Sequence, residues 1–172
     1  MDKAFLDTCV LFPPILRDFL LGMADRGLFL PLWSPSVAAE WLHVTARKGE
    51  AGAAEALARM RTRWPDGLVQ DGDVALLDLP DAADRHVLAG AIAGQARWLV
   101  TFNLRDFPRR ALALHGIEAR APDDFAMALW LAHRAVVEAE VARVWPGLQG
   151  RALRNAMKKA GLPRLGRALE TG

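Results

Sequence analysis

The sequence predicts an α/β protein, a three-layer α/β/α sandwich with a mostly parallel central sheet, followed by a C-terminal helical extension. Short apolar runs alternate with segments of helical periodicity, which is typical of parallel strands covered by helices on both faces. A chain of 172 residues with 52% hydrophobic and 24% charged residues is long enough to bury one such core. We find no repeats and no interior linker that would divide the chain.

The strands are predicted where short apolar runs are bounded by turn-forming residues. The opening run Ala-Phe-Leu and the later run Trp-Leu-Val-Thr are both of this kind. The predicted strands are residues 4–6, with 10–12 at the exit of the first, and residues 28–32, 74–79, 98–101 and 117–120.

The helices are predicted where apolar residues recur at helical spacing and capping residues mark the ends. Pro14 and Pro35 stand at first helical turns, where proline is tolerated, and Ser34 and Asp81 are suited to cap a helix. The acids at 123–124 favour the N-terminus of a long amphipathic helix. The predicted helices are residues 14–27, a helix from Ser34, residues 53–63, 82–95, 111–115 and 123–144, and a basic segment after Pro146 and Gly147.

Four isolated acidic residues stand where such a fold would bring them together. Asp7 and Asp106 each follow a strand-like run, and Glu40 and Asp84 lie near the starts of predicted helices. In an open parallel sheet these positions share one edge. Carboxylates gathered there repel one another unless cations lie between them, and oxygen ligands suit Mg²⁺ or Mn²⁺. The pattern predicts a metal-dependent phosphodiesterase.

Each acid also has an ordinary structural explanation. Asp7 alone is a turn or cap residue, and Glu40 alone is a solvated helix acid. Glu40, however, lies in an almost wholly apolar run, where an ionised side chain needs a partner, a metal or an exposed face. Asp81 competes with Asp84, one serving as a cap and the other facing the site. Cys9 stands where a phosphatase with an aspartyl nucleophile would carry its second acid, and we expect it to be a small buried hydrophobe.

The order of the four acids, the opening FLDTCVL and the segment DAADRHVLAGAIAGQARWLVTFNLRDFP resemble the PIN-domain ribonucleases. Within these, the chain is similar to the VapC-type toxins of bacterial toxin–antitoxin pairs. The similarity runs from about residue 4 to 125 and is most specific from 81 to 108. It divides the chain into a PIN-like nuclease domain at 1–125 and a helical extension at 126–172, packed on the same domain, that most VapC-type toxins lack.

The resemblance implies Mg²⁺-dependent cleavage of RNA, with Mn²⁺ as the alternative ion. Glu40 is left open between a metal ligand and a helper in deprotonating the attacking water. The implied catalytic residues are Asp7, Glu40, Asp84 and Asp106, and the implied metal ligands are Asp7, Asp84 and Asp106. The residues expected to orient these ligands are Thr101, Asn103 and Asp81.

The partners and the compartment follow from charge, cysteine use and the same resemblance. The net charge is only +2, but the C-terminal segment is basic. It is either a solvated helix face or a contact for RNA phosphates, through Arg151, Arg154, Lys158 and Lys159. One cysteine, with no signal peptide or membrane span, predicts a cytoplasmic protein. The resemblance implies a cognate antitoxin as protein partner, and a homodimer is left open.

Two other interpretations of the sequence remain open. The first is a non-catalytic RNA- or protein-binding module of the same fold, which the presence of all four acids disfavours. The second is a small-molecule phosphatase, which Cys9 disfavours. Trp33 and Trp41 lie near the predicted site, where a tryptophan can stack on a base, although we expect both to be buried. The residues without ligand-like spacing, which argue against a zinc site, are His43, His86, His115 and His133.

Overall fold

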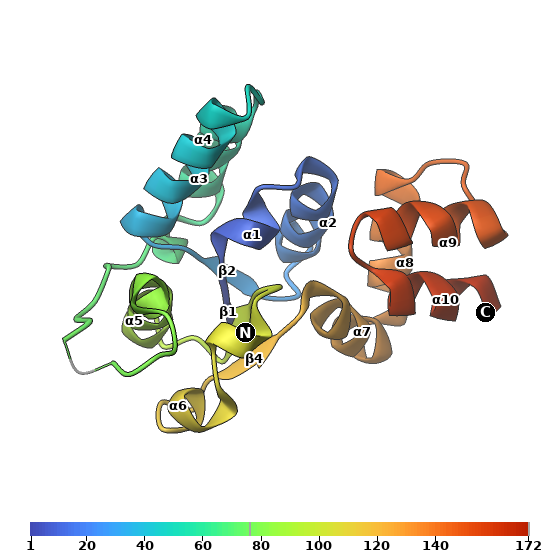
Figure 1. The fold of residues 1–172 in the computed structure, drawn as a ribbon. Coiled ribbons are helices and arrows are strands. Elements are labelled where there is room, and N and C mark those ends of the chain that lie inside the picture. The colour runs from blue at the N-terminus through green and yellow to red at the C-terminus, as the bar shows by residue number, and fades with distance from the viewer. Residues whose placement is uncertain (76, 172) are drawn as a thin grey trace.

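The chain folds around a four-stranded, all-parallel sheet (Figure 1). The computed structural model describes residues 1–75 and 77–171. The strand order is β2-β1-β3-β4, and Phe5 at the centre of β1 lies in register with Leu32 on one side and Leu99 on the other. The strands are β1 (Lys3–Leu6), β2 (Leu30–Leu32), β3 (Trp98–Val100) and β4 (Glu118–Arg120). The predicted α/β class and the parallel sheet are confirmed.

Helices cover both faces of this sheet. Helix α5 packs against β1 and β3, whereas α2 packs near β2 and α7 near β4 on the other side (Figure 1). Helices α3 and α4 pair and project away from the sheet. The helices are α1 (Thr8–Leu11), α2 (Pro14–Asp25), α3 (Pro35–Arg47), α4 (Ala53–Arg63), α5 (Arg85–Ala93), α6 (Arg109–Ala113), α7 (Pro122–Ala132), α8 (Arg134–Val144), α9 (Gly150–Lys159) and α10 (Pro163–Thr171), with single 3₁₀ turns η1 (Pro65–Gly67), η2 (Ala82–Asp84) and η3 (Leu104–Asp106).

Close packing of α5 on the sheet depends on a glycine. A Cβ atom at Gly90 would lie 2.7 Å from the ring of Phe5, so any larger residue would push α5 away from β1. On the opposite face, Phe29 and Trp98 both pack edge-on against Phe125, with ring centroids 5.0 and 6.5 Å apart. The aromatic contacts join β3 to α7 and so tie the start of the predicted extension to the sheet.

Several predicted elements lie where the sequence places them. Ser34 caps α3, and its hydroxyl accepts a hydrogen bond from the Val37 backbone N–H at 3.2 Å. Pro35 occupies the first helical turn, as predicted. Helix α4 spans the predicted 53–63 with Leu57 buried.

Five sequence predictions about secondary structure are wrong. Residues 10–12 belong to α1 and its C-cap, because Asp7 caps a helix directly after β1. Residues 74–75 and 77–79 form no strand, and residue 76 lies outside the described part of the chain. The helix predicted at 82–95 begins as the 3₁₀ turn η2 and ends at Ala93, and the helix at 111–115 lies two residues earlier, as α6.

The fifth error concerns the long helix predicted over 123–144. It is two helices, because the backbone of His133 leaves the helical region (φ −139°, ψ 53°). The break redirects the chain so that α8 packs on α2. The basic segment beyond it is likewise two helices, α9 and α10, which pack on each other, and α10 also packs on α7.

Two buried carboxylates hold the C-terminal helices in place. Asp123 on α7 accepts the backbone N–H groups of Arg164 at 2.8 Å and Leu165 at 3.1 Å, which satisfies the first turn of α10. Glu140 on α8 is 1% exposed and accepts hydrogen bonds from Arg26 and Arg143. The proposed boundary between residues 125 and 126 therefore falls inside α7, and the division into two parts stays a prediction.

No helix within residues 1–75 and 77–171 has the length and apolar character needed to cross a membrane.

Candidate active and metal site

Asp7 is the most firmly held of the candidate catalytic residues. It follows β1 directly, and its backbone N–H donates to the Val100 carbonyl of β3 at 3.1 Å. Its Oδ1 accepts the Thr8 backbone N–H at 2.7 Å, and its Oδ2 accepts the Thr101 hydroxyl at 2.8 Å. The carboxylate is 5% exposed, so two strands, one helix start and one hydroxyl fix its orientation at the carboxyl-terminal edge of the sheet.

Thr101 and Asn103 form a turn that supports Asp7. Thr101 is fully buried, and its hydroxyl oxygen also accepts the Asn103 backbone N–H at 3.0 Å. The Asn103 contribution comes from its backbone, whereas the sequence directed attention to its side chain. The structure thus places the Thr101 hydroxyl against Asp7, where it can orient the carboxylate.

Cys9 lies beside the same carboxylate. Its Sγ is 3.5 Å from Oδ2 of Asp7 and accepts the Phe102 backbone N–H at 3.3 Å. Burial raises the pKa of the Cys9 thiol to about 12, and the nearby charge of Asp7 adds to the shift. The thiol is therefore protonated at neutral pH and is no nucleophile.

Asp84 and Asp106 lie on two other segments. Together with Asp7 they form what we call the acidic edge of the sheet. Asp84 ends η2 and stands at the N-terminus of α5, and Asp106 ends η3 after β3. Burial, together with the negative charges of Asp106, Asp81 and Asp7, raises the pKa of Asp84 to about 6. The carboxylates of β1, β3 and α5 therefore act on one another through space. Asp81 itself caps η2 by accepting the Ala83 N–H at 2.9 Å.

Glu40 lies on the exposed face of α3, away from these contacts. Its Oε2 is 3.5 Å from Nε2 of His86, which is on α5. The side chain is 47% exposed, so an open face and a histidine neighbour satisfy the charge that its apolar flanks would otherwise leave unbalanced. Asp71, which the sequence did not single out, accepts the Ser36 N–H at 2.9 Å near the start of α3. Burial opposes ionisation of Asp71, but hydrogen bonds from Ser36 lower its pKa, with His86 contributing.

The acidic edge offers the type of ligand atom that a hard divalent cation prefers, which is carboxylate oxygen. No group of three or more His, Cys, Asp or Glu side chains in the described residues lies close enough together to hold a metal ion. Mg²⁺ does not require such a group, because it keeps several waters and uses one or two carboxylates together with substrate phosphates. Asp7, Asp84 and Asp106 supply carboxylate oxygens, which suit Mg²⁺ or Mn²⁺ better than Zn²⁺. The residues present fit such an ion.

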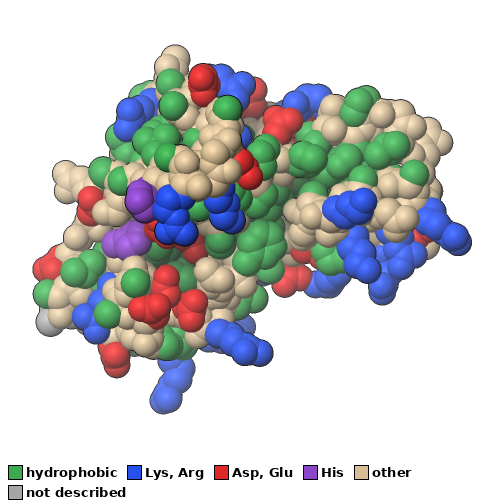
Figure 2. Space-filling view, turned by 45° about the horizontal axis from the view of Figure 1, so that its top comes forward, with side chains coloured by type: hydrophobic (Ala, Val, Ile, Leu, Met, Phe, Trp, Pro, Cys, Tyr) green, Lys and Arg blue, Asp and Glu red, His purple; other side chains and the backbone are tan. Residues whose placement is uncertain are grey.

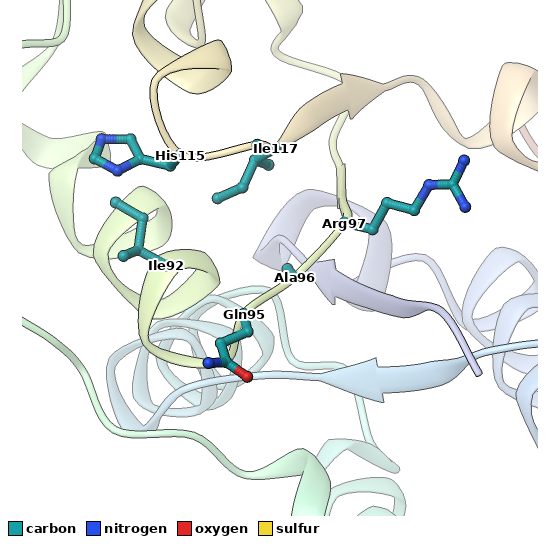
Figure 3. A pocket seen from close by; sticks show the side chains of 7 residues that line it. Ile92, Gln95, Ala96, Arg97, His115 and Ile117 are labelled. Carbon is teal, nitrogen blue, oxygen red and sulfur yellow. The ribbon is translucent and has the colours of Figure 1, made fainter.

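The pocket of Figure 3 lies at the other end of the sheet. It has a volume of about 340 Å³ and lies between the end of α5 and the loop before β4. Ile92 and His115 face it, whereas the Arg97 side chain points away (Figure 3) and pairs with Asp2. With no carboxylate in its lining, this pocket is separate from the acidic edge.

The described tryptophans Trp33 and Trp41 are both fully buried, as expected. Trp41 packs under the side chain of Arg17, whose guanidinium lies 5.1 Å from the ring centroid. Base stacking on either ring is excluded by this burial.

The basic residues of α9 differ in whether they are engaged by another side chain or exposed to solvent. Arg154 donates to Glu170 at 2.8 Å, so it is engaged inside the extension. Arg151, Lys158 and Lys159 are exposed. Figure 2 shows Lys and Arg side chains gathered on one side of the lobe formed by the C-terminal helices.

The chain belongs to the PIN-domain family, because the model of the PIN domain matches residues 3–105, more than half of its length. The match includes Asp7, Glu40, Asp84 and Thr101 and ends one residue before Asp106. Over 44 residues the chain is 50% identical to "Putative ribonuclease VapC50" of Mycobacterium tuberculosis, a stretch that covers 26% of each protein. The chain thus matches about a quarter of that curated relative. No solved structure matches it significantly.

The raised pKa of Asp84 predicts a pH-dependent stability of the metal-free protein. Its folded-state pKa of about 6 exceeds the ordinary value of 3.8, so the folded state binds this proton more tightly than the unfolded state. That contribution is present below pH 3.8 and is lost as the pH rises through 6. We expect urea unfolding in EDTA to show wild type losing roughly 1 kcal/mol relative to Asp84→Asn between pH 4 and 7, a value discounted for partial exposure. A constant difference between the two proteins would contradict the carboxylate crowding.

Proposed function

We propose that this protein is a divalent-metal-dependent endoribonuclease and the toxin of a toxin–antitoxin pair. The observation that carries the proposal is the convergence of Asp7, Asp84 and Asp106 at one sheet edge of a PIN-domain chain. The name of the Mycobacterium tuberculosis relative, a ribonuclease, supports the same activity. We further propose a cytoplasmic location, in keeping with a single free cysteine.

In this proposal Asp7, Asp84 and Asp106 would together hold Mg²⁺ or Mn²⁺. A divalent ion bound there supplies an acidified water and neutralises charge on the phosphodiester. Thr101 and the Thr8 backbone N–H keep both oxygens of Asp7 in fixed positions. Asp84, whose pKa is raised to about 6 by burial and by the neighbouring carboxylates, would have this pKa lowered again by a cation bound beside it.

Glu40 has a different role in this proposal from that of the three aspartates. Its contact with His86 joins α3 to α5, the helix that begins after Asp84. An exposed carboxylate next to a histidine can exchange a proton with water at the border of the site. We therefore favour a proton-handling role for Glu40 over direct ligation.

The experiment that tests the activity compares two phosphoester substrates. Purified protein is freed of metal by chelation and given either single-stranded RNA or a chromogenic phosphomonoester, with and without added Mg²⁺. We expect metal-dependent RNA cleavage and no release of the chromogen. Rapid hydrolysis of the phosphomonoester would instead identify a phosphatase, and inactivity on both substrates would leave a binding module.

The toxin role predicts an effect on growth. Expression of this chain alone should slow bacterial growth, and Asp7→Asn should abolish the effect because it removes a ligand without removing the fold. Co-expression with a small protein encoded beside it should restore growth and yield a complex on purification. A wild-type chain that is harmless at high expression, with no protein co-purifying, would refute the toxin role while leaving the nuclease chemistry intact.

The inhibitory partner is expected to present a basic side chain to the acidic edge. Arginine pairs with carboxylates through two parallel hydrogen bonds and can occupy the place of a cation. The exposed residues Glu40 and His43 lie on α3, which packs on α1 and α5, whereas Trp41 is buried and unavailable to a partner. We propose this face of α3 as the docking position.

A further inference from the structure

An aromatic side chain stands exposed at the border of the candidate site. Phe102 directly follows Thr101, whose hydroxyl holds Asp7, and the phenyl side chain is 42% exposed. Its backbone N–H donates to Cys9 Sγ, so the base of the side chain is fixed one residue from the support of Asp7. The backbone of Phe102 is thus fixed next to the residue that supports Asp7, while part of its side chain faces solvent.

The ring of Phe102 lies against the turn between α9 and α10. A Cβ atom at Gly161 would be 2.9 Å from the end of the ring, so glycine is required for this close approach. Gly161 also has φ +90°, which disfavours other residues at the turn. The C-terminal extension therefore reaches the acidic edge and forms one wall beside Phe102.

That wall is positively charged. Lys158 and Lys159 occupy the last turn of α9, and the Gly161 N–H donates to the Lys158 carbonyl at 3.1 Å. Both lysines are exposed, and neither forms an ion pair with a carboxylate in residues 1–75 and 77–171. An exposed ring that packs on the turn directly after two unpaired lysines has the composition of a single-strand binding surface, in which rings stack on bases and cations contact phosphates.

We propose that Phe102 stacks on an unpaired base of the RNA substrate, with the adjoining phosphates on Lys158 and Lys159. The proposal rests on the ribonuclease function and adds that the strand is single at this position, because the bases of a duplex do not present their faces. The extension thereby takes part in binding substrate. A protein partner at this surface would bury the Phe102 ring in an apolar contact. The two unpaired lysines beside the turn favour a polyanion over such a partner.

Binding of fluorescent oligonucleotides tests the proposal without any need for catalysis. In the Asp7→Asn background, anisotropy gives the affinity for a single-stranded RNA and for a duplex of equal length. We expect Phe102→Ala to weaken single-strand binding by about tenfold or more and to leave weak duplex binding unchanged. Phe102→Trp should keep the affinity and Phe102→Leu should not. Replacing Lys158 and Lys159 with glutamine should flatten the salt dependence by roughly 0.7 log units per lost contact.

The control for these variants is Leu114→Ala. Leu114 is 85% exposed and follows α6, in the segment that leads to β4. It should leave RNA affinity and thermal stability unchanged, and thermal melts should show that the Phe102 variants are folded.

Equal RNA affinity of Phe102→Ala and wild type overturns the stacking role. So does full retention of affinity by Phe102→Leu, which would indicate a generic apolar contact suited to a protein. These outcomes are separate from the nuclease proposal: Phe102-dependent binding by a protein that never cleaves RNA would refute the nuclease and keep the stacking site.

Discussion

Asp7→Asn is expected to abolish metal-dependent RNA cleavage while leaving the protein folded. Asparagine keeps an oxygen that can accept the Thr8 N–H, so the cap of α1 survives. It removes one of the negative charges that raise the pKa of Asp84, so the metal-free variant should be as stable as wild type or more so. We expect at least a roughly 100-fold fall in cleavage rate, since the outer partners of metal ligands alone are worth about 10- to 100-fold.

The matched control is Glu55→Gln, which neutralises an exposed acid in the first turn of α4. Cleavage rates and thermal melts, each with and without Mg²⁺, should distinguish the two variants. Full activity of Asp7→Asn would refute the site assignment. A grossly destabilised Asp7→Asn protein would show instead that the residue is chiefly structural.

Glu140→Ala should cause the largest loss of stability. Arg26 donates to Oε2 of Glu140 at 2.7 Å, and Arg143 donates to Oε1 at 2.6 Å. Gly22 on α2 lies directly under this carboxylate, since a Cβ there would overlap Oε1. The substitution removes two charge-assisted hydrogen bonds and the packing of a buried side chain, while both arginines keep access to solvent and Arg143 keeps its pair with Asp18. The expected cost is about 2–3 kcal/mol. Urea unfolding followed by circular dichroism measures it.

Glu138→Ala is the matched control for this substitution, because Glu138 lies on the same helix but outside the Glu140 network. It accepts hydrogen bonds from Trp130 and Arg134 at the surface, and the expected cost is about 1 kcal/mol or less. If Glu140→Ala were no more harmful than Glu138→Ala, α8 would not be anchored to α2 through this network.

The central part of the fold could be predicted because its signals are local. Ser34 followed by Pro35 marks a helix start through side-chain and backbone chemistry within one turn. The apolar runs at β1 and β3 are buried on both faces, so they read as continuous hydrophobic stretches. The same strands explain the positions of two acids, because Asp7 directly follows β1 and Asp106 ends the η3 turn that comes after β3.

The structural features that could not be predicted from the sequence depend on contacts between distant segments. The apolar pattern continues across His133, so nothing local indicates the break that lets Glu140 meet Arg26. Glu40 was expected with the three aspartates, but its partner in the structure is His86 on another helix. The position of Gly161 against Phe102 likewise arises only when the α9–α10 turn meets the end of β3.

The central claim is that the acidic edge binds a divalent cation, and Mn²⁺ binding tests it most directly. Metal-free protein is titrated with Mn²⁺, and the free ion is measured by electron paramagnetic resonance, for wild type and for the Asp7→Asn/Asp106→Asn double variant. We predict saturable binding to wild type and its loss in the folded double variant. Equal binding by the two proteins would contradict a metal site at Asp7 and Asp106.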